Sequence, residues 1–381
     1  MKKSPRLFLY GYYGFGNVGD DLLLNTVVTS TLKFVPDARF VVRSLCPVEG
    51  VVPSAQIEFV ALEQVMSDHR LSKVRRLGRY LRDTWKSLAG CTHLVFGGGT
   101  LFHARGNSPV NLALIFMLVV MARLRGLEVY ALGVGVAPLS GALPKRLMRG
   151  IMARTADFAV RDESSLRHCQ ALANGAGLRS TADLVFSLPL PAVSRAAVAE
   201  RRPVVAITLA ASDIGNGAQH EHFLRQLALA LDLLVKQGWS ICFLAFQELD
   251  QAGIAVSDTA LFKRVQSCVP NLEGTMVRMS ANSEEITRLF SAIDVVAGMR
   301  FHGHVLAAMQ GIPFVGFGRD EKLKDLCSHL SMPFLDMGDL DATDLAATIA
   351  GARDAQPDAE RVRELSRRSA DNFSRIGASL S

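Results

Sequence analysis

The sequence predicts an α/β protein of two Rossmann-like, doubly wound parallel-sheet domains that face a cleft, and three observations support this fold class. Short apolar segments rich in Val, Leu and Phe alternate with helical patterns along all 381 residues. These segments are continuous and do not alternate with polar residues, which is typical of parallel strands covered on both faces. A Pro-containing stretch from Leu188 to Pro203 interrupts the pattern, and a fresh strand begins at Val204 much as one begins at Leu7.

The alternation of strands with helices indicates βαβ units in both halves. A first domain over residues 1–190 and a second over residues 200–350 agree with the length, because 381 residues exceed one ordinary core. A last helix, from about Ala359 to Phe373, lies in a terminal segment of residues 355–381 and either packs against one domain or crosses between them. The expected strands are Leu7–Tyr10, Phe40–Arg43, His93–Phe96, Val129–Leu132, Phe158–Val160, Val204–Leu209, Ile241–Phe246, Ile293–Ala297 and Phe314–Phe317.

Composition excludes several classes of protein. The chain is 49% apolar and 20% charged, as in globular domains, and its net charge is only +6. The longest apolar run, Leu112–Met121, is about half of the ~20 residues that a bilayer crossing needs. No signal-peptide pattern follows the basic N-terminus. We therefore expect a cytoplasmic protein that is at most peripheral at the inner face of the membrane.

The six cysteines are scattered without paired short spacings. This distribution is typical of reduced, buried thiols and not of a disulfide framework or a zinc site. No cluster with metal-ligand spacing is present, so no metal is expected. Nucleic acid is not expected as a partner either, because no basic surface interleaved with aromatic residues appears.

The segment 70–88 is unusually basic. Its charged residues follow one side of a helix, while Val74, Leu77, Leu81, Trp85 and Leu88 follow the other at helical spacing. Such a helix can lie on an anionic membrane. The favoured alternative is a surface helix whose apolar face joins the core.

The strongest functional signal is the segment Gly298–Phe317. A strand ends, Arg300, His302 and His304 follow at the start of a short helix, the helix ends at Gly311, and a second apolar strand begins. Ligands of open α/β sheets bind at such strand ends. A helix start with a fixed positive charge suits an anion, and an imidazole beside it suits acid–base chemistry.

The first turn, Gly11–Asp21, contains a glycine pattern close to that of dinucleotide-binding sites. We do not expect a dinucleotide there, because the turn is long and Asp20 and Asp21 would repel a pyrophosphate at the helix start. These carboxylates either cap the helix or accept hydrogen bonds from sugar hydroxyls. The glycines allow a ligand to approach the backbone closely.

Further strand ends carry glycine or charge. Gly97–Gly99 and Gly133–Gly135 offer bare backbone after successive strands, as turns or as substrate sites. Arg161 follows another strand and is expected to project into the cleft, unless it folds back on a neighbouring carboxylate. Asp183 is expected to be structural, at the end of a strand within residues 181–186.

Taken together, these motifs resemble the polysaccharide pyruvyl transferase family. The resemblance spans nearly the whole chain, and it is specific because six or seven motifs occur in the same order. They are Gly11–Asp20, Gly97–Gly99 with Leu101, Gly133–Pro138, Val160–Ser164, Ala182-Asp183, Gly298–His302 and Gly316–Lys322. The sequence departs from the family at Asp21, where Glu is commoner, and at Glu321, where Pro is usual.

The resemblance implies a GT-B-like fold and a reaction in which the enolpyruvyl unit of phosphoenolpyruvate forms a ketal on a sugar and phosphate is released. It also implies no cofactor, and a saccharide acceptor that is either a polymer or held on a lipid carrier. The family's donor-binding groups fall on Arg161, Arg300, His302 and Lys322. We predict catalytic roles for His302, Arg300 and Arg161. The predicted substrate-binding residues are Lys322, Gly14, Asn17, Asp20, Gly98, Gly99, His103, Gly135 and His304.

Two other functions remain open from the sequence. One is a GT-B glycosyltransferase that uses a nucleotide sugar, and the other is a non-catalytic partner that binds a glycan or an anion. For the pyruvyl transfer reaction, we expect that replacing His302 or Arg300 by Ala abolishes most turnover and leaves the protein folded.

Overall fold

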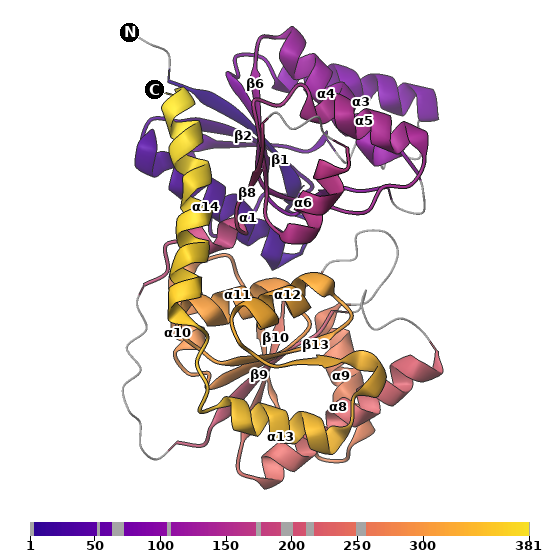
Figure 1. Cartoon of the computed structure of the whole chain (residues 1–381), viewed down its shortest axis with the longest axis vertical. Coiled ribbons are helices and arrows are strands. Elements are labelled where there is room, and N and C mark those ends of the chain that lie inside the picture. Colours follow the sequence, from indigo (N-terminus) through magenta and orange to yellow (C-terminus); the bar gives the residue numbers. More distant parts are fainter. Residues whose placement is uncertain are drawn as a thin grey trace. The chain divides into compact units, whose positions relative to one another are not determined.

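The computed structural model describes residues 4–51, 54–62, 72–104, 108–172, 177–191, 201–210, 217–248 and 257–380. The chain divides into two compact units (Figure 1). Unit 1 comprises residues 1–15, 20–188 and 365–381, and unit 2 comprises residues 16–19 and 189–364. The boundary after Leu188 therefore lies within the predicted linker 188–203. The short turn 16–19, near the N-terminus, also belongs to unit 2.

In unit 1, the described residues form a parallel sheet of eight strands in the order β3-β2-β1-β4-β6-β7-β8, with β5 paired to β6. The strands are β1 (Arg6–Tyr13), β2 (Arg39–Ser44), β3 (Ile57–Val60), β4 (His93–Gly97), β5 (Thr100–Phe102), β6 (Glu128–Val136), β7 (Asp157–Val160) and β8 (Leu178–Ser180). The chain order reverses direction between β1 and β4, which is the switch point of a doubly wound sheet.

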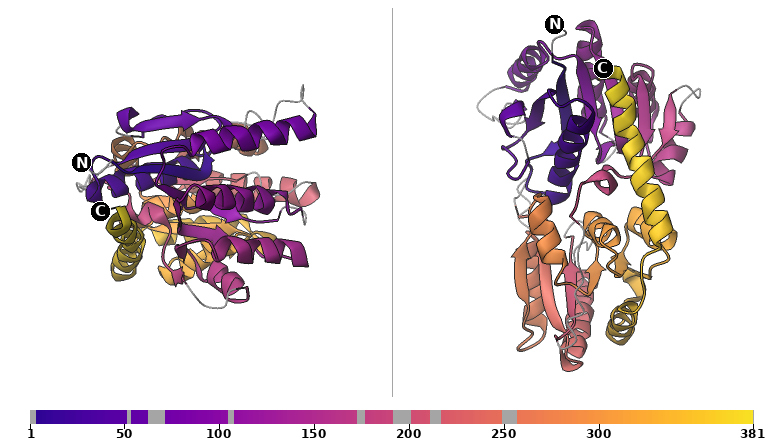
Figure 2. Two further views of the ribbon diagram at one scale, coloured as in Figure 1. Left: turned by 90° about the horizontal axis from the view of Figure 1, so that it is seen from above. Right: turned by 90° about the vertical axis from the view of Figure 1, so that its left-hand side faces the viewer.

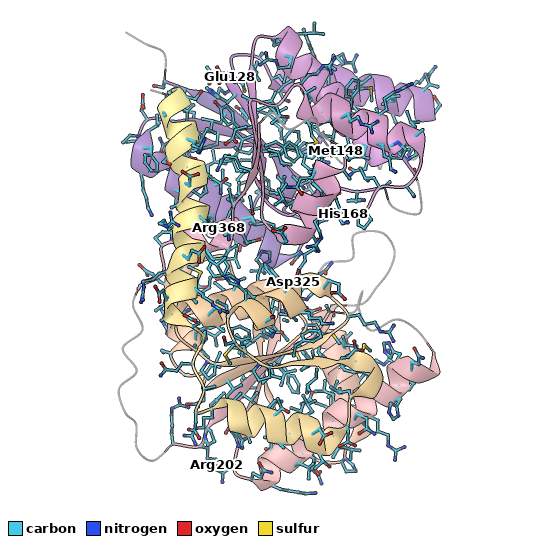
Figure 3. The ribbon with its side chains drawn as sticks, viewed as in Figure 1. Glu128, Met148, His168, Arg202, Asp325 and Arg368 are labelled. Carbon is cyan, nitrogen blue, oxygen red and sulfur yellow. The ribbon has the colours of Figure 1, made fainter. Side chains whose placement is uncertain are left out.

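Helices cover both faces of the unit-1 sheet. They are α1 (Val18–Phe34), α3 (Lys73–Ser87), α4 (Val110–Leu124), α5 (Ala142–Met152), α6 (Glu163–Gln170) and the C-terminal part of α14 (Ala359–Leu380). Helices α3 to α6 lie on one side and α1 with α14 on the other (Figures 1 and 2). Met148 of α5, labelled in Figure 3, is fully buried in the core under the first group. Arg368 of α14 donates to Thr181 O at 2.8 Å and so fastens the last helix to the end of β8.

Unit 2 repeats the same plan. Its described residues form a six-stranded parallel sheet in the order β11-β10-β9-β12-β13-β14. The strands are β9 (Val204–Thr208), β10 (Ser240–Ala245), β11 (Thr275–Arg278), β12 (Val295–Gly298), β13 (Phe314–Gly318) and β14 (Phe334–Asp336). The switch point lies between β9 and β12, directly before the segment that carries Arg300 and His302.

The unit-2 helices are α8 (Ala218–Lys236), α9 (Asp258–Cys268), α10 (Ser283–Phe290), α11 (Phe301–Met309), α12 (Glu321–His329) and α13 (Ala342–Ala352). Helices α8, α9 and α13 bury one apolar cluster against the sheet. Helices α10, α11 and α12 lie on the opposite face (Figure 1). Three short 3-10 helices also occur in the described chain, at Ser54–Gln56 and Leu184–Ser187 of unit 1 and Met337–Asp339 of unit 2.

All nine predicted strands are confirmed. The sequence missed β3, β5, β8, β11 and β14. One prediction was wrong: residues 181–186 do not form a strand, because β8 ends at Ser180 and Asp183 caps the 3-10 helix Leu184–Ser187 through a hydrogen bond from Val185 N. The last helix extends beyond the predicted end, to Leu380, and its division between the units falls after Glu364.

The predicted basic helix is α3, whose described part begins at Lys73; the predicted start at Arg70 lies outside the described residues. Tyr80 and Leu88 join the core, as the favoured alternative requires. Val74, however, is 81% exposed, and Leu77 and Trp85 are also exposed. The apolar face is therefore only partly buried.

All six cysteines are free. Cys91, Cys169, Cys242 and Cys327 are buried, as predicted, whereas Cys46 is exposed and Cys268 is partly exposed. Burial raises the pKa of the Cys91 and Cys242 thiols to about 11. Within the ranges that the structure describes, no helix combines the length and the apolar character needed to span a bilayer.

Candidate active site

The segment after β12 enters the unit-2 switch point through backbone pairing. Met299 N donates to Thr208 O at 2.9 Å, and Arg300 N donates to the Thr208 hydroxyl at 3.3 Å. Gly298 permits this close approach, because a β-carbon there would collide with Thr208 O. The end of β12 is thereby held against the end of β9, where doubly wound folds bind ligands.

Arg300 is held in one orientation by acceptors on three residues. Its Nη2 donates to Asp258 Oδ1 at 2.5 Å and to Gln247 Oε1 at 3.2 Å, and its Nε donates to Leu209 O at 2.9 Å. The side chain is 14% exposed. These hydrogen bonds engage Nε and Nη2 of the guanidinium.

Asp258 is the buried counter-ion of Arg300. It has no exposed surface, and its Oδ2 accepts hydrogen bonds from the backbone N–H groups of Phe246 and Gln247 at 2.9 and 3.0 Å. Burial raises the pKa of Asp258, and the Arg300 guanidinium and the two N–H groups oppose that rise. Loss of Arg300 would leave a buried carboxylate without its charge partner, which costs about 3–5 kcal/mol. We therefore expect the Arg300→Ala protein to be less stable than the wild type.

A cavity of about 190 Å³ lies beside this pair within unit 2. Its walls include Asn17, Arg300, His302 and Asp320. The lining also contains Ala210, Phe246, Met299 and Phe301. Because the volume is smaller than the ~300–1,000 Å³ of drug-sized ligand pockets, it suits a small ligand. The structure thus brings together three of the predicted site residues, Asn17, Arg300 and His302.

The start of α11 faces this cavity. Its N-cap residue is Arg300, which forms no side-chain cap hydrogen bond. The neighbouring helix α12 is instead closed by its own N-cap, because the Asp320 carboxylate accepts from Lys322 N at 3.0 Å. A helix N-terminus favours negative charge, so α11 adds to the attraction that Arg300 exerts on an anion.

His302 is half-buried in the first turn of α11, and its position depends on a glycine of α1. Gly19 packs directly against the imidazole, and a β-carbon there would collide with Nδ1. Gly19 belongs to the turn 16–19, which is joined to unit 2 by Val18 N donating to Phe246 O at 2.9 Å and Glu248 N donating to Gly16 O at 3.3 Å. The turn therefore forms one wall of the His302 environment.

His304 and Lys322 lie near the cavity but do not line it. His304 has no exposed surface; its Nδ1 lies 2.9 Å from Arg300 O and its Nε2 lies 3.2 Å from Val315 O. Burial lowers the pKa of His304. Its position gives it a structural role between α11 and β13 in place of the substrate contact that the sequence suggested. Lys322 is half-buried in the first turn of α12.

In unit 1, Arg161 directly follows β7 and is almost buried, with 6% of its side chain exposed. Its Nη1 donates to Asp183 at 2.9 Å and its Nη2 to the Thr100 hydroxyl at 2.9 Å. Its Nε lies 3.4 Å from Asp162, so the predicted interaction with a neighbouring carboxylate is present. Asp162 also caps α6 by accepting from Ser165 N at 2.7 Å.

The first glycine turn brings two carboxylates to the unit-1 switch point. Gly14 has φ +69°, and a β-carbon there would collide with Cys46 O. Its N–H donates to Asp21 Oδ1 at 2.9 Å. Burial, and to a smaller extent the charge of Asp20, raise the pKa of Asp21 to about 6 against the hydrogen bond from Gly14. A β-carbon on Gly99 would lie 3.4 Å from Asp20 Oδ1, so the turn after β4 adjoins this carboxylate.

The remaining predicted residues of unit 1 lie near the same edge of the sheet. Gly135 packs beside Thr100 and Arg161, and its N–H donates to Gly99 O at 2.7 Å. Gly98 follows β4 and donates to Leu132 O at 3.0 Å. His103 pairs with the Tyr12 hydroxyl through Nε2 at 2.8 Å, with the two rings stacked.

Sequence reasoning missed four residues that shape these sites. Gln247 could have been found, because it comes directly after the expected strand Ile241–Phe246 and so lies at the carboxyl edge of the sheet. Asp258 carried no comparable signal, since an acidic residue at the start of a helix is usually an exposed cap. The hydroxyl of Thr100 accepts a hydrogen bond from Arg161 Nη2, and the hydroxyl of Thr208 accepts one from Arg300 N. No group of three or more potential metal-ligating side chains occurs within the described ranges.

The model of the polysaccharide pyruvyl transferase family matches residues 17–321. This match covers most of the chain, from the turn that carries Asn17 to the start of α12. The chain belongs to the polysaccharide pyruvyl transferase family. It is therefore a transferase enzyme, and the family indicates a saccharide acceptor. A comparison with curated proteins finds no matching relative.

Solved structures show the fold of this pyruvyl transferase family member. A UDP-GlcNAc 2-epimerase from Methanocaldococcus jannaschii aligns with TM-score 0.64 and 8% identity over 99% of both chains. A putative UDP-N-acetylglucosamine 2-epimerase from Listeria monocytogenes gives 0.63 and 8% over 99% of this chain and 96% of that one. A calicheamicin glycosyltransferase gives 0.50 and 14% over 99% and 98%. At these identities the likeness shows the fold alone, which is the predicted GT-B fold of two parallel-sheet α/β domains.

Proposed function

We propose that this enzyme transfers the enolpyruvyl unit of phosphoenolpyruvate to two hydroxyls of a sugar, forming a pyruvate ketal and releasing phosphate. The observation that carries the donor assignment is the small unit-2 cavity lined by Arg300, His302 and Asn17 at the start of α11. Its size fits a three-carbon phosphorylated acid better than a nucleotide sugar.

Phosphoenolpyruvate carries a carboxylate and a phosphate, so its binding requires fixed cationic donors. Arg300 supplies one, because Asp258 and Gln247 hold its guanidinium in place before the donor arrives. The N-terminus of α11 supplies a second favourable potential. Lys322 of α12 would add a second charged side chain. Preorganised groups of this kind stabilise charge without reorganising during the reaction.

The addition of the first hydroxyl then needs two proton transfers. This hydroxyl loses its proton as its oxygen bonds to C2 of the donor, and C3 gains a proton to become a methyl group. A tetrahedral intermediate that still bears phosphate results. The oxygen of the second hydroxyl then bonds to C2 as the bond from C2 to the phosphate oxygen breaks, and the proton of this hydroxyl is taken up by the departing inorganic phosphate. We assign the acid–base role to His302, since an imidazole can both give and take a proton near neutral pH.

We further propose that the unit-1 switch point binds the acceptor. Asp20 and Asp21 lie beside the turns after β1 and β4, where carboxylates can accept hydrogen bonds from hydroxyl groups. Gly98, Gly99, Gly135 and His103 extend the same edge. The acceptor is a sugar of a bacterial polysaccharide or of its lipid-linked precursor, modified on the cytoplasmic side of the membrane. A donor contact for Arg161 stays a prediction.

The reaction is tested by incubating the purified protein with phosphoenolpyruvate and a panel of sugar acceptors. The expected result is phosphate release together with a mass gain of one pyruvyl group on one acceptor. Nucleotide release from a nucleotide sugar, with phosphoenolpyruvate inert, would instead indicate a glycosyltransferase. Binding of phosphoenolpyruvate or glycan without turnover would indicate a non-catalytic partner.

His302→Ala tests the assignment of the acid–base group. The expected loss in kcat is at least roughly 10²-fold, the usual scale for one such group. The matched control is His222→Ala, which removes an exposed imidazole from α8 and should leave kcat unchanged. Equal turnover by both purified variants would remove His302 from the mechanism.

A further inference from the structure

Exposed apolar side chains gather on the outer layer of unit 1 formed by α3, α4 and α5. Nine large apolar side chains are exposed among the described residues, and six of them belong to these three helices. The six are Val74 (81% exposed), Leu77 (37%), Trp85 (39%), Val110 (58%), Leu124 (74%) and Leu143 (55%). Single exposed apolar residues are ordinary, whereas a concentration in one layer marks an interaction surface.

The same three helices are strongly basic. Their spans contain six basic residues in α3, one in α4 and three in α5, against a single acidic residue, Asp83. The chain as a whole is nearly balanced, with 42 basic and 36 acidic residues. The excess of positive charge is therefore concentrated where the apolar side chains are exposed.

Helix α3 turns both kinds of residue outward. Tyr80 and Leu88 occupy its inner side and pack in the unit-1 core. Arg75, Arg79, Arg82 and Lys86 are exposed and, with Gly78 and Asp83, line an open depression of about 560 Å³. Both Arg79 and Arg82 lie within 4 Å of Asp83, so one carboxylate serves two guanidinium groups.

The three helices form one continuous layer. Helix α4 packs against α5, and Arg154, just beyond α5, lies over the Phe116 ring of α4 at 5.3 Å. Arg125, which directly follows α4, stacks on the Trp85 ring of α3 at 4.0 Å. Figures 1 and 2 show the three helices on the same side of the unit-1 sheet.

We propose that the outer surface of α3, α4 and α5, here called the basic–apolar layer, binds the headgroup region of an anionic lipid bilayer. Apolar side chains beside Arg and Lys are the composition of segments that lie in the membrane interface. The apolar groups enter the boundary of the acyl chains, while the cations neutralise lipid phosphates. The charge complementarity, ten basic residues to one acidic, selects an anionic bilayer over a neutral surface.

The position of the layer suits an acceptor presented from the membrane. Val74, Val110 and Leu143 lie in the first turns of their helices. In a doubly wound sheet, helices begin at the edge where strands end, and that edge of unit 1 also carries the glycine turns and Asp20. The inference itself rests on the surface alone and does not depend on the proposed reaction.

The experiment is sedimentation of the full-length protein with vesicles of phosphatidylcholine alone or with about one third phosphatidylglycerol. We expect binding only to the anionic vesicles, and weaker binding as salt rises. Arg75→Gln with Arg79→Gln should weaken binding roughly 25-fold, about fivefold for each charge removed. Val74→Ser with Leu77→Ser should weaken it at least about tenfold.

Matched controls come from other parts of the chain. Leu229→Ser with Val235→Ser removes two apolar side chains of α8 that are 37% and 39% exposed. Arg363→Gln with Arg367→Gln removes two exposed charges of α14. Both control pairs should bind anionic vesicles as the wild type does. Melting temperature confirms that each variant is folded.

Three results would overturn the inference. The first is that the protein binds neutral and anionic vesicles equally, or binds neither. The second is that the test pairs and the control pairs lose the same amount of binding. The third is a changed oligomeric state in the Val74→Ser, Leu77→Ser variant, because that result would assign the layer to self-association. Turnover with a soluble sugar acceptor is measured on the same samples. Vesicle binding without turnover would count against the proposed reaction alone, and turnover without vesicle binding against the membrane inference alone.

Discussion

The two units share one sheet topology but end their central strands with opposite chemistry. In unit 2, β12 leads into Arg300 and His302, and the Asp258 carboxylate that pairs with Arg300 is completely buried. In unit 1, β1 and β4 lead into glycine turns beside Asp20 and Asp21. The two sheets therefore share one topology, while the residues after the strand ends place a guanidinium and an imidazole at one switch point and two carboxylates at the other.

The units also share a paired arginine. Arg300 is bound to Asp258 and Arg161 to Asp183, and both carboxylates are almost completely buried. The difference is exposure, because Arg300 lines a cavity with 14% of its side chain exposed and Arg161 retains 6%. An arginine that only neutralises a buried acid can be removed together with that acid, whereas one that binds substrate cannot.

Substituting Arg300 alone and then together with Asp258 separates a structural role of Arg300 from a role in substrate binding, and it has the largest expected effects. Arg300→Ala should lower the free energy of unfolding by about 3–5 kcal/mol, since Asp258 loses its charge partner. Adding Asp258→Ala should restore much of that stability, but kcat should stay at least roughly 10²-fold below wild type. Denaturant unfolding and phosphate release measure the two quantities. Recovery of turnover in the double variant would reduce Arg300 to a structural residue.

The same cycle in unit 1 tests the donor contact predicted for Arg161. Arg161→Ala should destabilise by about 3–5 kcal/mol, and Asp183→Ala in addition should recover much of the loss. If Arg161 contacts the donor, KM for phosphoenolpyruvate stays raised in the double variant. A double variant with wild-type KM and kcat would show that Arg161 only supports the fold of unit 1.

The acidic switch point predicts a pH dependence of stability. The pKa of Asp21 is raised to about 6 in the folded protein. Between about pH 4 and pH 6, its carboxyl group is therefore protonated in the folded state and ionised in the unfolded state. The free energy of unfolding should therefore fall by up to about 3 kcal/mol as pH rises from about 4 to 6 and then level off. Asp21→Asn should flatten this fall and raise Tm at pH 7. Parallel Tm profiles of the two proteins would contradict the assignment.

The smallest predicted effect concerns the packing of Gly19 on His302. Gly19→Ala should displace the ring and lower kcat about tenfold, the scale of a small misplacement of a reacting group. The protein should remain folded, because a helical Ala is intrinsically favoured over Gly. Gly351→Ala is the control, since a β-carbon there meets no atom within 4 Å. An unchanged kcat in Gly19→Ala would show that the position of His302 is not critical.

The sequence predicted the interior of both sheets and missed their margins. Strands such as β9 and β12 are continuously apolar because neighbours cover both faces. The missed β3, β8, β11 and β14 are the four edge strands and are only partly buried. Short, half-exposed segments lack the apolar run on which the prediction depended. The fifth missed strand, β5, has three residues and follows the glycine turn of β4.

The sequence allowed us to predict where in the fold the candidate site residues lie, but not which side chains they contact. Arg300 and His302 were found because charge after a buried strand is unusual. The partner of Arg300 could not be found, because Asp258 comes from another βα connection and nothing local distinguishes it from an ordinary helix cap. His304 was misjudged for the same reason, since spacing on a short helix does not tell which ring faces the core.

The assignment of residues 16–19 to unit 2 has a consequence for dissecting this enzyme. Asn17, a wall residue of the Arg300 cavity, is encoded far upstream, before almost all of unit 1. A fragment cut from residues 189–364 would keep a complete sheet yet lack that wall and the glycine that packs on the imidazole. For the proposed donor, we expect the affinity measured on such a fragment to fall below that of the intact chain, and exchanging this half with a related enzyme requires transplanting two separate pieces of sequence.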